Sequence, residues 1–304
     1  YLNKALKIKP DDYEVIKDLG NTYQAVGDTN TAKNYYQKAI AINSAYAPAL
    51  TNLGILQIKT SNKQEALSLL IKATESEPKL APAWGNLANG YIQLGNTKEA
   101  EQCCRKAIEL NPNLFNSHLL LATILFGNNN LQEAEKSYRK VIELKPDFPE
   151  AHSNLGSILN DLGKLQEAEL SLRKSIEINP NIFNSHLLLA KILIRQKKLK
   201  EAEKELLKTI ALKPDLFQAH LNLGAVLKDL GELKEAALAT SKSIKLKPDF
   251  FQAHLNLAAI LKSQGKSQEA ERSIRKAIKL QPDYSDSYLQ LSSILINNGN
   301  LKEA

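Results

Sequence analysis

Hydrophobic and small residues recur along the chain with a helical spacing, and the same arrangement returns every 34 residues. In the segment 149–182, Leu155 and Ile158 belong to one apolar stripe, and Ala168 and Leu172 belong to a second one. Each stripe has a period near ~3.6 residues, which is typical of an amphipathic helix. Each 34-residue segment therefore predicts two helices, which we name helix A and helix B.

Whole words of sequence return at the same interval. FQAHLNL occurs at 217–223 and 251–257, and FNSHLLLA occurs at 115–122 and 183–190, an offset of 68, twice 34. Steps of 34 from the first proline meet Ser44 once and otherwise only prolines: Pro10, Pro78, Pro112, Pro146, Pro180, Pro214, Pro248 and Pro282. One fixed period without insertions predicts a repeat array in which each unit stacks on the next.

Turn residues separate the predicted helices. A glycine stands between helix A and helix B in six repeats: Gly27, Gly95, Gly163, Gly231, Gly265 and Gly299. Glycine accepts the left-handed conformation that closes a helix. Proline followed by Asp or Asn ends helix B, and we expect Asp147 and Asn181 to cap the helices that follow them.

This pattern resembles the tetratricopeptide repeat (TPR). One repeat displays the family signature at repeat positions 4, 7, 8, 11, 20, 24 and 32 as Trp84, Leu87, Ala88, Tyr91, Ala100, Cys104 and Pro112. Position 20 is alanine in every row: Ala32, Ala66, Ala100, Ala134, Ala168, Ala202, Ala236, Ala270 and Ala304. A small residue at this position allows helix B to approach helix A closely. An aliphatic residue replaces the aromatic one in many rows, which leaves the fold assignment intact.

The resemblance implies an all-α fold, a right-handed α-solenoid of antiparallel helix pairs. Eight full repeats start at 13, 47, 81, 115, 149, 183, 217 and 251, and residues 1–12 and 285–304 read as partial repeats. We expect 1–304 to form a single solenoid within a longer protein. Because neither end carries a polar cap, we also expect end-to-end self-association through the terminal repeats.

Composition and charge limit the classes of partner and the cellular compartment that we expect for the protein. The first 150 residues carry 17 Lys/Arg and 16 Asp/Glu, a net charge of +1, and the remainder carries 23 and 17, a net charge of +6. A nucleic-acid binder needs a concentrated basic stripe, so we expect no nucleic-acid partner. The chain contains no apolar run long enough to span a membrane, so we expect no membrane partner. The two adjacent cysteines, Cys103 and Cys104, favour a reducing compartment, and we expect a cytoplasmic protein.

The histidines form a regular row. All five stand at repeat position 4, where the TPR signature places a core aromatic residue: His118, His152, His186, His220 and His254. Neighbouring helices pack about 8–10 Å apart, too far for two imidazoles to share one zinc ion. We therefore expect packing histidines, with no metal and no cofactor. A Cys104–His118 nucleophile pair lacks an orienting group, so we expect this chain not to be an enzyme.

Repeat positions 2, 5, 6, 9, 13 and 16 point away from the predicted core, and in TPR arrays this side of helix A lines the peptide groove. Position 6 carries a row of asparagines, interrupted by Leu120 and Leu188: Asn52, Asn86, Asn154, Asn222 and Asn256. An amide both donates and accepts, so it can pair with any peptide backbone. The row resembles the asparagine ladder of O-GlcNAc transferases. Alternatively, these asparagines bond to the neighbouring repeat or are solvated.

Two arrangements of charged and polar residues lie on the same face. Lys17, Asn21 and Asn52 match part of a TPR clamp for terminal carboxylates, but Pro82 and Asn86 occupy the places of its cations. We therefore reject the clamp and keep Lys17 and Asn21 as candidate peptide contacts. Lys191 and Arg195 could steer an acidic peptide, although a solvated charged face is the simpler interpretation.

These observations predict a non-catalytic protein-interaction scaffold that holds an extended peptide or protein segment along the A helices. The alternative is a substrate-recruiting arm of a larger enzyme, such as a glycosyltransferase, with its catalytic domain outside this chain. A third hypothesis is a purely structural scaffold.

Overall fold

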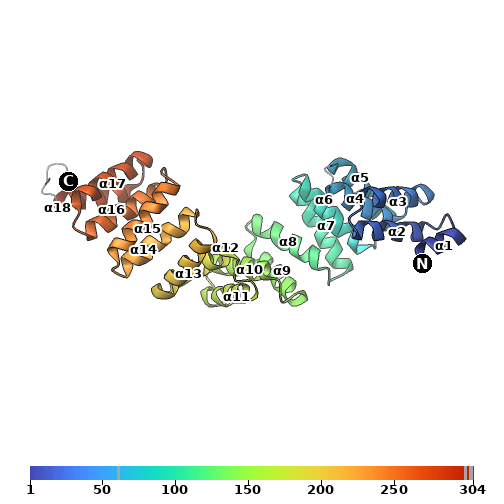
Figure 1. Cartoon of the computed structure of the whole chain (residues 1–304), viewed down its shortest axis with the longest axis horizontal. Helices are drawn as coiled ribbons and strands as arrows, with labels where there is room; N and C mark the ends of the chain where they lie inside the picture. The colour runs from blue at the N-terminus through green and yellow to red at the C-terminus, as the bar shows by residue number, and fades with distance from the viewer. Residues whose placement is uncertain (60–61, 298–299, 301–303) are drawn as a thin grey trace. The chain divides into compact units, whose positions relative to one another are not determined.

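The computed structural model describes residues 1–59, 62–297, 300 and 304. Gly299, one of the predicted turn glycines, lies outside the described residues. Within the described part every regular element is an α-helix (Figure 1). The prediction of an all-α solenoid of antiparallel helix pairs is confirmed.

The A helices begin at the predicted repeat starts. They are α2 (Tyr13–Ala25), α4 (Ala47–Lys59), α6 (Ala81–Gln93), α8 (Phe115–Gly127), α10 (Pro149–Asp161), α12 (Phe183–Arg195), α14 (Phe217–Asp229), α16 (Phe251–Ser263) and α18 (Ser285–Asn297). The B helices are α3 (Thr29–Ile42), α5 (Lys63–Ser76), α7 (Thr97–Leu110), α9 (Leu131–Leu144), α11 (Leu165–Ile178), α13 (Leu199–Leu212), α15 (Leu233–Leu246) and α17 (Ser267–Leu280). The short α1 (Leu2–Ile8) precedes them.

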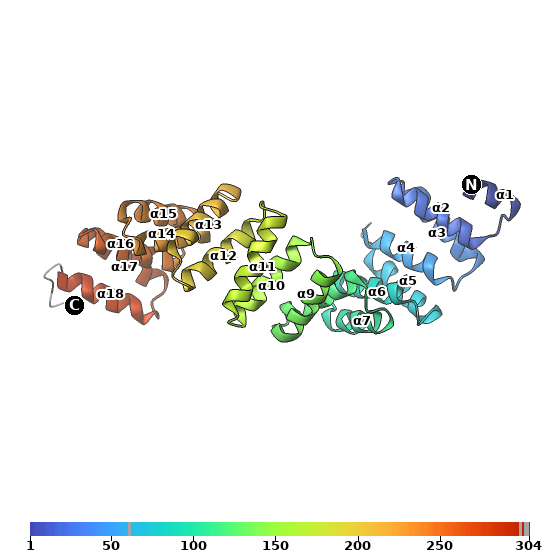
Figure 2. The same cartoon turned by 90° about the horizontal axis from the view of Figure 1, so that it is seen from below.

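The chain forms two compact units, Tyr1–Pro146 (unit 1) and Asp147–Ala304 (unit 2). Each A helix from α2 to α16 packs most extensively on its own B helix, and α4, α6, α8, α12, α14 and α16 pack next on the B helix before them, as Figures 1 and 2 allow the reader to follow. The continuous single solenoid remains a prediction.

Helix A and helix B approach closely at positions 8 and 20. The position-20 alanines of the eight complete pairs are fully buried: Ala32, Ala66, Ala100, Ala134, Ala168, Ala202, Ala236 and Ala270. Position 8 is glycine in Gly156, where an added Cβ would lie 2.6 Å from Cγ of Leu172 and 3.3 Å from the carbonyl oxygen of Ala168. The sequence pattern thus sets how closely the two helices pack.

The expected caps of α10 and α12 are wrong. Phe148 and Ile182 are the N-cap residues, and neither has a side-chain cap bond. Asn181 instead lies in the turn before the cap, where its N–H donates to Oδ1 of Asn179 at 3.0 Å. Side-chain caps do occur in unit 1, where Oδ1 of Asp12 accepts from the N–H groups of Glu14 and Val15 at 3.2 Å each.

Candidate functional site

A pocket of about 400 Å³ lies between α6 and α8 in unit 1. Its lining comes from repeat positions 2, 5, 6 and 9 of both A helices, together with the residue before α8: Pro82, Gly85, Asn86, Asn89, Leu114, Asn116, Leu119, Leu120 and Thr123. We call this surface the A-face pocket. It lies on the side of helix A where the resemblance to TPR arrays predicts a peptide groove.

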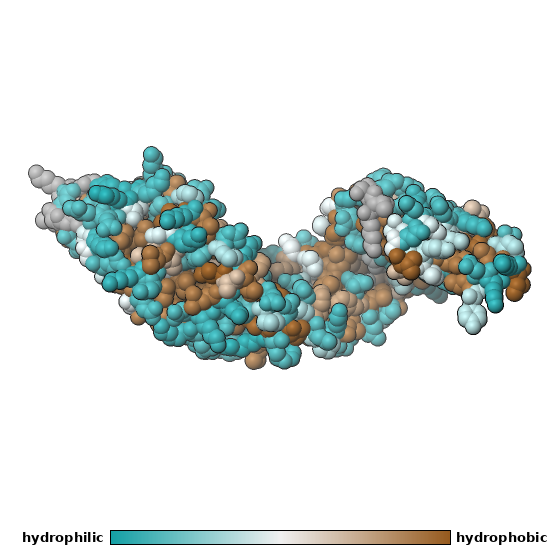
Figure 3. Space-filling view, viewed as in Figure 1, coloured by the Kyte–Doolittle hydropathy of each residue, from teal (hydrophilic) through white to brown (hydrophobic). Residues whose placement is uncertain are grey.

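The lining of the A-face pocket carries no charge. Leu114, Leu119 and Leu120 are partly buried, whereas Asn89 and Asn116 are exposed. Apolar carbon therefore lies deeper than the free amides. Such a combination suits a ligand with an apolar group and a polar backbone. The space-filling view in Figure 3 shows hydrophobic residues among hydrophilic ones on the face that it presents.

The amides of the pocket differ in their hydrogen bonding. Nδ2 of Asn86 donates to the carbonyl oxygen of Pro82, at 2.8 Å, on its own helix. Among the described residues, the side chains of Asn89 and Asn116 make no hydrogen bond. They are therefore the amides of this pocket that are available to an incoming backbone.

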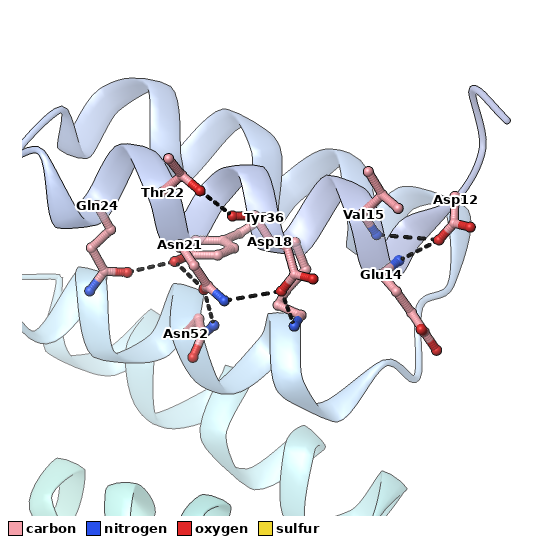
Figure 4. A network of polar contacts seen from close by, with 10 residues as sticks. Asp12, Glu14, Val15, Asp18, Asn21, Thr22, Gln24, Tyr36 and Asn52 are labelled. Carbon is pink, nitrogen blue, oxygen red and sulfur yellow. Dashed lines mark hydrogen bonds and ion pairs between the residues drawn. The ribbon is translucent and has the colours of Figure 1, made fainter. Parts of the chain in front are cut away.

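Asn52 belongs to a network inside unit 1, drawn in Figure 4. Its Nδ2 donates to Oδ1 of Asn21 at 2.7 Å, and the Tyr36 hydroxyl donates to the same oxygen at 2.9 Å. Lys17 donates to Asp18 at 2.5 Å, and Asp18 also accepts from Asn21. Burial raises the pKa of Tyr36 to about 12, so its hydroxyl remains a donor. The Asn52–Asn21 bond joins two repeats, whereas the contacts of Lys17 and Asn21 with Asp18 lie within α2, so all three candidate side chains already have partners.

The asparagines of unit 2 are arranged differently. Asn154, Asn222 and Asn256 are all half-buried, and Asn154 takes part in a contact of its own. Asn222 and Asn256 have no hydrogen-bond partner among the residues that the structure describes. The interruptions Leu120 and Leu188 are also half-buried. The predicted ladder therefore contains both engaged and available amides.

The two basic candidate residues, Arg195 and Lys191, also differ in their contacts. Nη1 of Arg195 donates to Oδ1 of Asn160 at 2.6 Å, which joins α12 to α10. Lys191 is exposed and has no ion pair within the described residues. A second hollow of about 520 Å³ lies between α16 and α18, where Lys262 donates to the hydroxyl of Ser293 at 2.5 Å.

The histidines pack as predicted. Nε2 lies 2.9 to 3.0 Å from the carbonyl oxygen of the proline six residues earlier, in the pairs His118–Pro112, His186–Pro180, His220–Pro214 and His254–Pro248. A carbonyl can only accept, so Nε2 carries the proton. Nε1 of Trp84 donates to Pro78 in the same way, at 2.9 Å. Where position 4 carries histidine or tryptophan, the ring N–H thus bonds to the proline carbonyl of the preceding turn.

The two cysteines are buried thiols. Burial raises the pKa of Cys103 to about 11 and that of Cys104 to about 12, so both remain thiols at neutral pH. Within the described chain, no cluster of His, Cys, Asp or Glu has the make-up of a metal site. None of the described helices has both the length and the hydrophobicity needed to cross a bilayer.

Sequence reasoning missed most of the residues that line the A-face pocket. It singled out Asn86, Pro82 and Leu120 there, but not Gly85, Asn89 or Asn116. The repeat positions of these residues had been placed on the groove side, so following positions 2, 5 and 9 as well as 6 would have found them.

Comparison with known proteins agrees with this architecture. Residues 6–220, more than half of the chain, match the family model of the Cilia and flagella-associated protein 70 C-terminal domain. Tetratricopeptide repeat models match 217–250, 251–284 and 274–304. Two of these matches begin at predicted repeat starts. No curated protein matches the chain.

Solved structures with a similar fold include several TPR proteins. YrrB, described as "a TPR protein with an unusual peptide-binding site", is 23% identical over 60% of this chain and 95% of its own, with a TM-score of 0.51. MamA is 23% identical over 57% and 94%, with a TM-score of 0.52. The C-terminal part of a TPR repeat-containing protein from Cytophaga hutchinsonii is 15% identical over 79% and 99%, with a TM-score of 0.63.

These structural likenesses concern the fold alone, whereas the family match spans most of the repeats. The chain belongs to the Cilia and flagella-associated protein 70 C-terminal domain family, and its 34-residue units are tetratricopeptide repeats.

Proposed function

We propose that the chain is a protein-interaction module that binds an extended peptide segment along the A helices, with α6 and α8 as its central contact in unit 1. The observation that carries this proposal is the A-face pocket. Consecutive A helices contribute the same repeat positions to one hollow, and that hollow is uncharged and holds the free amides Asn89 and Asn116.

The repeat spacing suits an extended chain. Three residues of extended peptide span about 10 Å, and neighbouring helices lie about 8–10 Å apart. One amide per repeat can therefore meet the peptide backbone at regular intervals. In unit 2, the available amides Asn222 and Asn256 come from consecutive A helices and offer the same kind of contact. The likeness to YrrB in fold supports a peptide ligand without identifying one.

The proposal is tested with the double variant Asn89→Ala/Asn116→Ala and an array of short capped peptides. We expect binding to weaken for every peptide that the wild type holds, because backbone contacts carry no side-chain information. Asn34→Ala is the matched control, since Asn34 is an exposed asparagine on the B helix α3. If the double variant binds the peptides as tightly as the wild type does, the peptides bind to another surface and the A-face pocket is not the peptide site.

The substrate-recruiting arm of a larger enzyme would use the same surface, so it depends on the same binding event. It differs in one consequence, which is that the bound segment is modified by a catalytic domain joined to this chain. Incubating the whole protein with its bound peptide and measuring the peptide mass distinguishes the two functions.

A further inference from the structure

The chain contains an internal comparison for the A-face pocket. The word FNSHLLLA begins both α8 (115–122) and α12 (183–190). In α8, Leu119 is partly buried and lines the A-face pocket. In α12 its counterpart Leu187 is only 7% exposed. Identical sequences thus have different surroundings, and the cause lies in neighbouring residues.

One neighbour that differs is repeat position 5 of the preceding A helix. This residue is Gly85 before α8 and Ser153 before α12. A Cβ atom at Gly85 would lie 2.7 Å from Oγ of Ser117. At the equivalent place in unit 2, the Ser185 hydroxyl donates to Oγ of Ser153 at 3.0 Å. A buried serine pair therefore stands in unit 2 where, in unit 1, Ser117 faces a glycine that has no side chain.

Gly85 stands alone in this respect among the A helices. Every other repeat carries a side chain at position 5: Lys17, Thr51, Leu119, Ser153, Leu187, Leu221, Leu255 and Leu289. The same pocket also contains Leu120 at position 6, where the other repeats mostly have asparagine. Two departures from the repeat pattern, a missing side chain and an apolar one, meet in one hollow.

We infer that Gly85 and Leu120 make the A-face pocket an anchor site for one large uncharged apolar side chain, such as Leu or Phe, of the bound peptide. The inference rests on the proposed peptide-binding function and specifies what that ligand must contain. A charged side chain entering this pocket would lose water without gaining an ion pair, because no lining residue is charged. The partly buried carbon of Leu114, Leu119 and Leu120 contacts the apolar group instead.

The amides of the pocket complete the recognition. Asn89 and Asn116 belong to α6 and α8, one on each of the two helices that form the pocket. Each can pair with the peptide backbone beside the anchor residue. The leucines would then select the side chain, and the asparagines would hold the chain that carries it.

The test uses the full chain and fluorescently labelled, capped Ser/Thr peptides with one central residue varied among Leu, Phe, Ala, Asn and Glu. Burial of a large apolar side chain is strong enough to change affinity by about tenfold or more. We expect the wild type to bind the Leu and Phe peptides at least about tenfold more tightly than the Asn and Glu peptides. Gly85→Ser should reduce this preference to within about twofold.

Gly85→Ser is a conservative test, because the chain already accommodates the same serine pair at Ser153 and Ser185. The added Cβ would lie 2.7 Å from Oγ of Ser117, a hydroxyl that can rotate away, and serine favours a helix more than glycine does, so the melting temperature should not fall. Leu120→Asn, which restores the residue common at position 6, should abolish the preference independently. Asn34→Ala, on the B helix α3, is the matched control and should leave the preference unchanged.

The possible results separate the two proposals. If no peptide binds at the A-face pocket, the proposed function is wrong and the proposed anchor site is wrong with it. If peptides bind there but the wild type does not distinguish Leu from Asn, only the anchor is overturned. The same holds if Gly85→Ser and Leu120→Asn both keep the full preference while they remain folded.

Discussion

Nδ1 of His186 lies 2.6 Å from Oε2 of Glu205, and both side chains are largely buried, with 4% and 16% exposed. The other ring nitrogen of His186 faces the carbonyl oxygen of Pro180. Both ring nitrogens therefore meet acceptors, an arrangement that suits the protonated imidazolium. Burial alone lowers the pKa of His186, but the hydrogen bonds to Glu205 and Pro180 and the Glu205 charge outweigh it, so the pKa is raised.

A raised folded-state pKa fixes the sign of the pH dependence. The stabilising contribution of His186 is complete below its unfolded pKa of about 6.5 and is lost as the pH rises through the folded value. We expect hydrogen-exchange protection of α12 and α13 to fall as the pH increases above about 6.5, beyond the intrinsic change in exchange rate. Glu205→Gln should remove this dependence and cost about 1–3 kcal/mol at pH 6, as for a hydrogen bond to a charged group. Equal pH profiles for the two proteins would contradict the assignment.

A second prediction concerns the turn between α12 and α13. Lys197 has φ of 61° at the place where other repeats have glycine with positive φ, such as Gly231 at 83°. Lys197→Gly should stabilise unit 2 by about 1 kcal/mol, because a side chain is unfavourable in the left-handed region. Gly231→Lys should destabilise it by a similar amount. Asn129→Gly should gain less, since asparagine tolerates this conformation. Denaturant unfolding measures all three, and a loss of stability in Lys197→Gly would contradict the argument.

The close contact of α10 with α11 gives a third prediction. Gly156→Ala should destabilise unit 2 by about 1–3 kcal/mol, because the added carbon would overlap Leu172 in a packed interface. Alanine alone would favour the helix by up to about 1 kcal/mol, so a loss of stability shows that packing prevails. Ala190 provides the comparison, since it already stands at position 8 of its repeat and is buried. Ala190→Gly should also destabilise, through the helix propensity. A more stable Gly156→Ala would show that Leu172 moves without cost.

A fourth prediction is that substitutions of the position-6 asparagines affect either peptide binding or stability, depending on the residue. Asn222→Ala/Asn256→Ala should weaken peptide binding in unit 2 by about 1–3 kcal/mol, the scale of one or two hydrogen bonds. Stability should change by less than about 0.5 kcal/mol, because neither amide has a partner in the described chain. Asn52→Ala should instead lower stability by about 1 kcal/mol through the lost bond to Asn21. Calorimetric titration and thermal unfolding measure the two quantities. The reverse assignment of effects would make Asn222 and Asn256 structural.

Self-association remains a prediction that the exposed side chains of α18 make concrete. Leu289 is 69% exposed and Ile296 is 53% exposed on this helix. Leu289→Glu/Ile296→Glu should shift the protein towards monomer in sedimentation velocity at high concentration. The matched variant Leu170→Glu changes an equally exposed leucine, at 69%, on α11 and should have no such effect. A wild type that stays monomeric at all concentrations excludes this association.

The 34-residue period explains why so much of the fold could be predicted from the sequence. Gly163, Ala168 and Pro180 each have a local physical role, and the 34-residue period repeats that role along the chain. The start of each A helix followed directly. The caps did not, because Asp147 and Asn181 resemble capping residues by type but stand one residue too early.

The candidate site was less accessible from sequence, because a pocket arises from departures from the pattern rather than from the pattern itself. Asn52 and Asn222 share a repeat position, yet only Asn52 has the neighbour Asn21 to bond with. The sequence alone does not show that a side chain at Gly85 would meet Ser117 of the next repeat. Such properties depend on pairs of residues in adjacent repeats, which a single row of the alignment does not reveal.

The bond from position 4 to the preceding proline carbonyl crosses the line at which the repeats are divided. His118 belongs to one repeat by sequence, but its proton is held by Pro112 of the repeat before it. A fragment that began at residue 115 would leave this donor without its acceptor. The piece of chain that can be excised or exchanged intact therefore starts before the proline, out of register with the 34-residue unit by which the sequence is read.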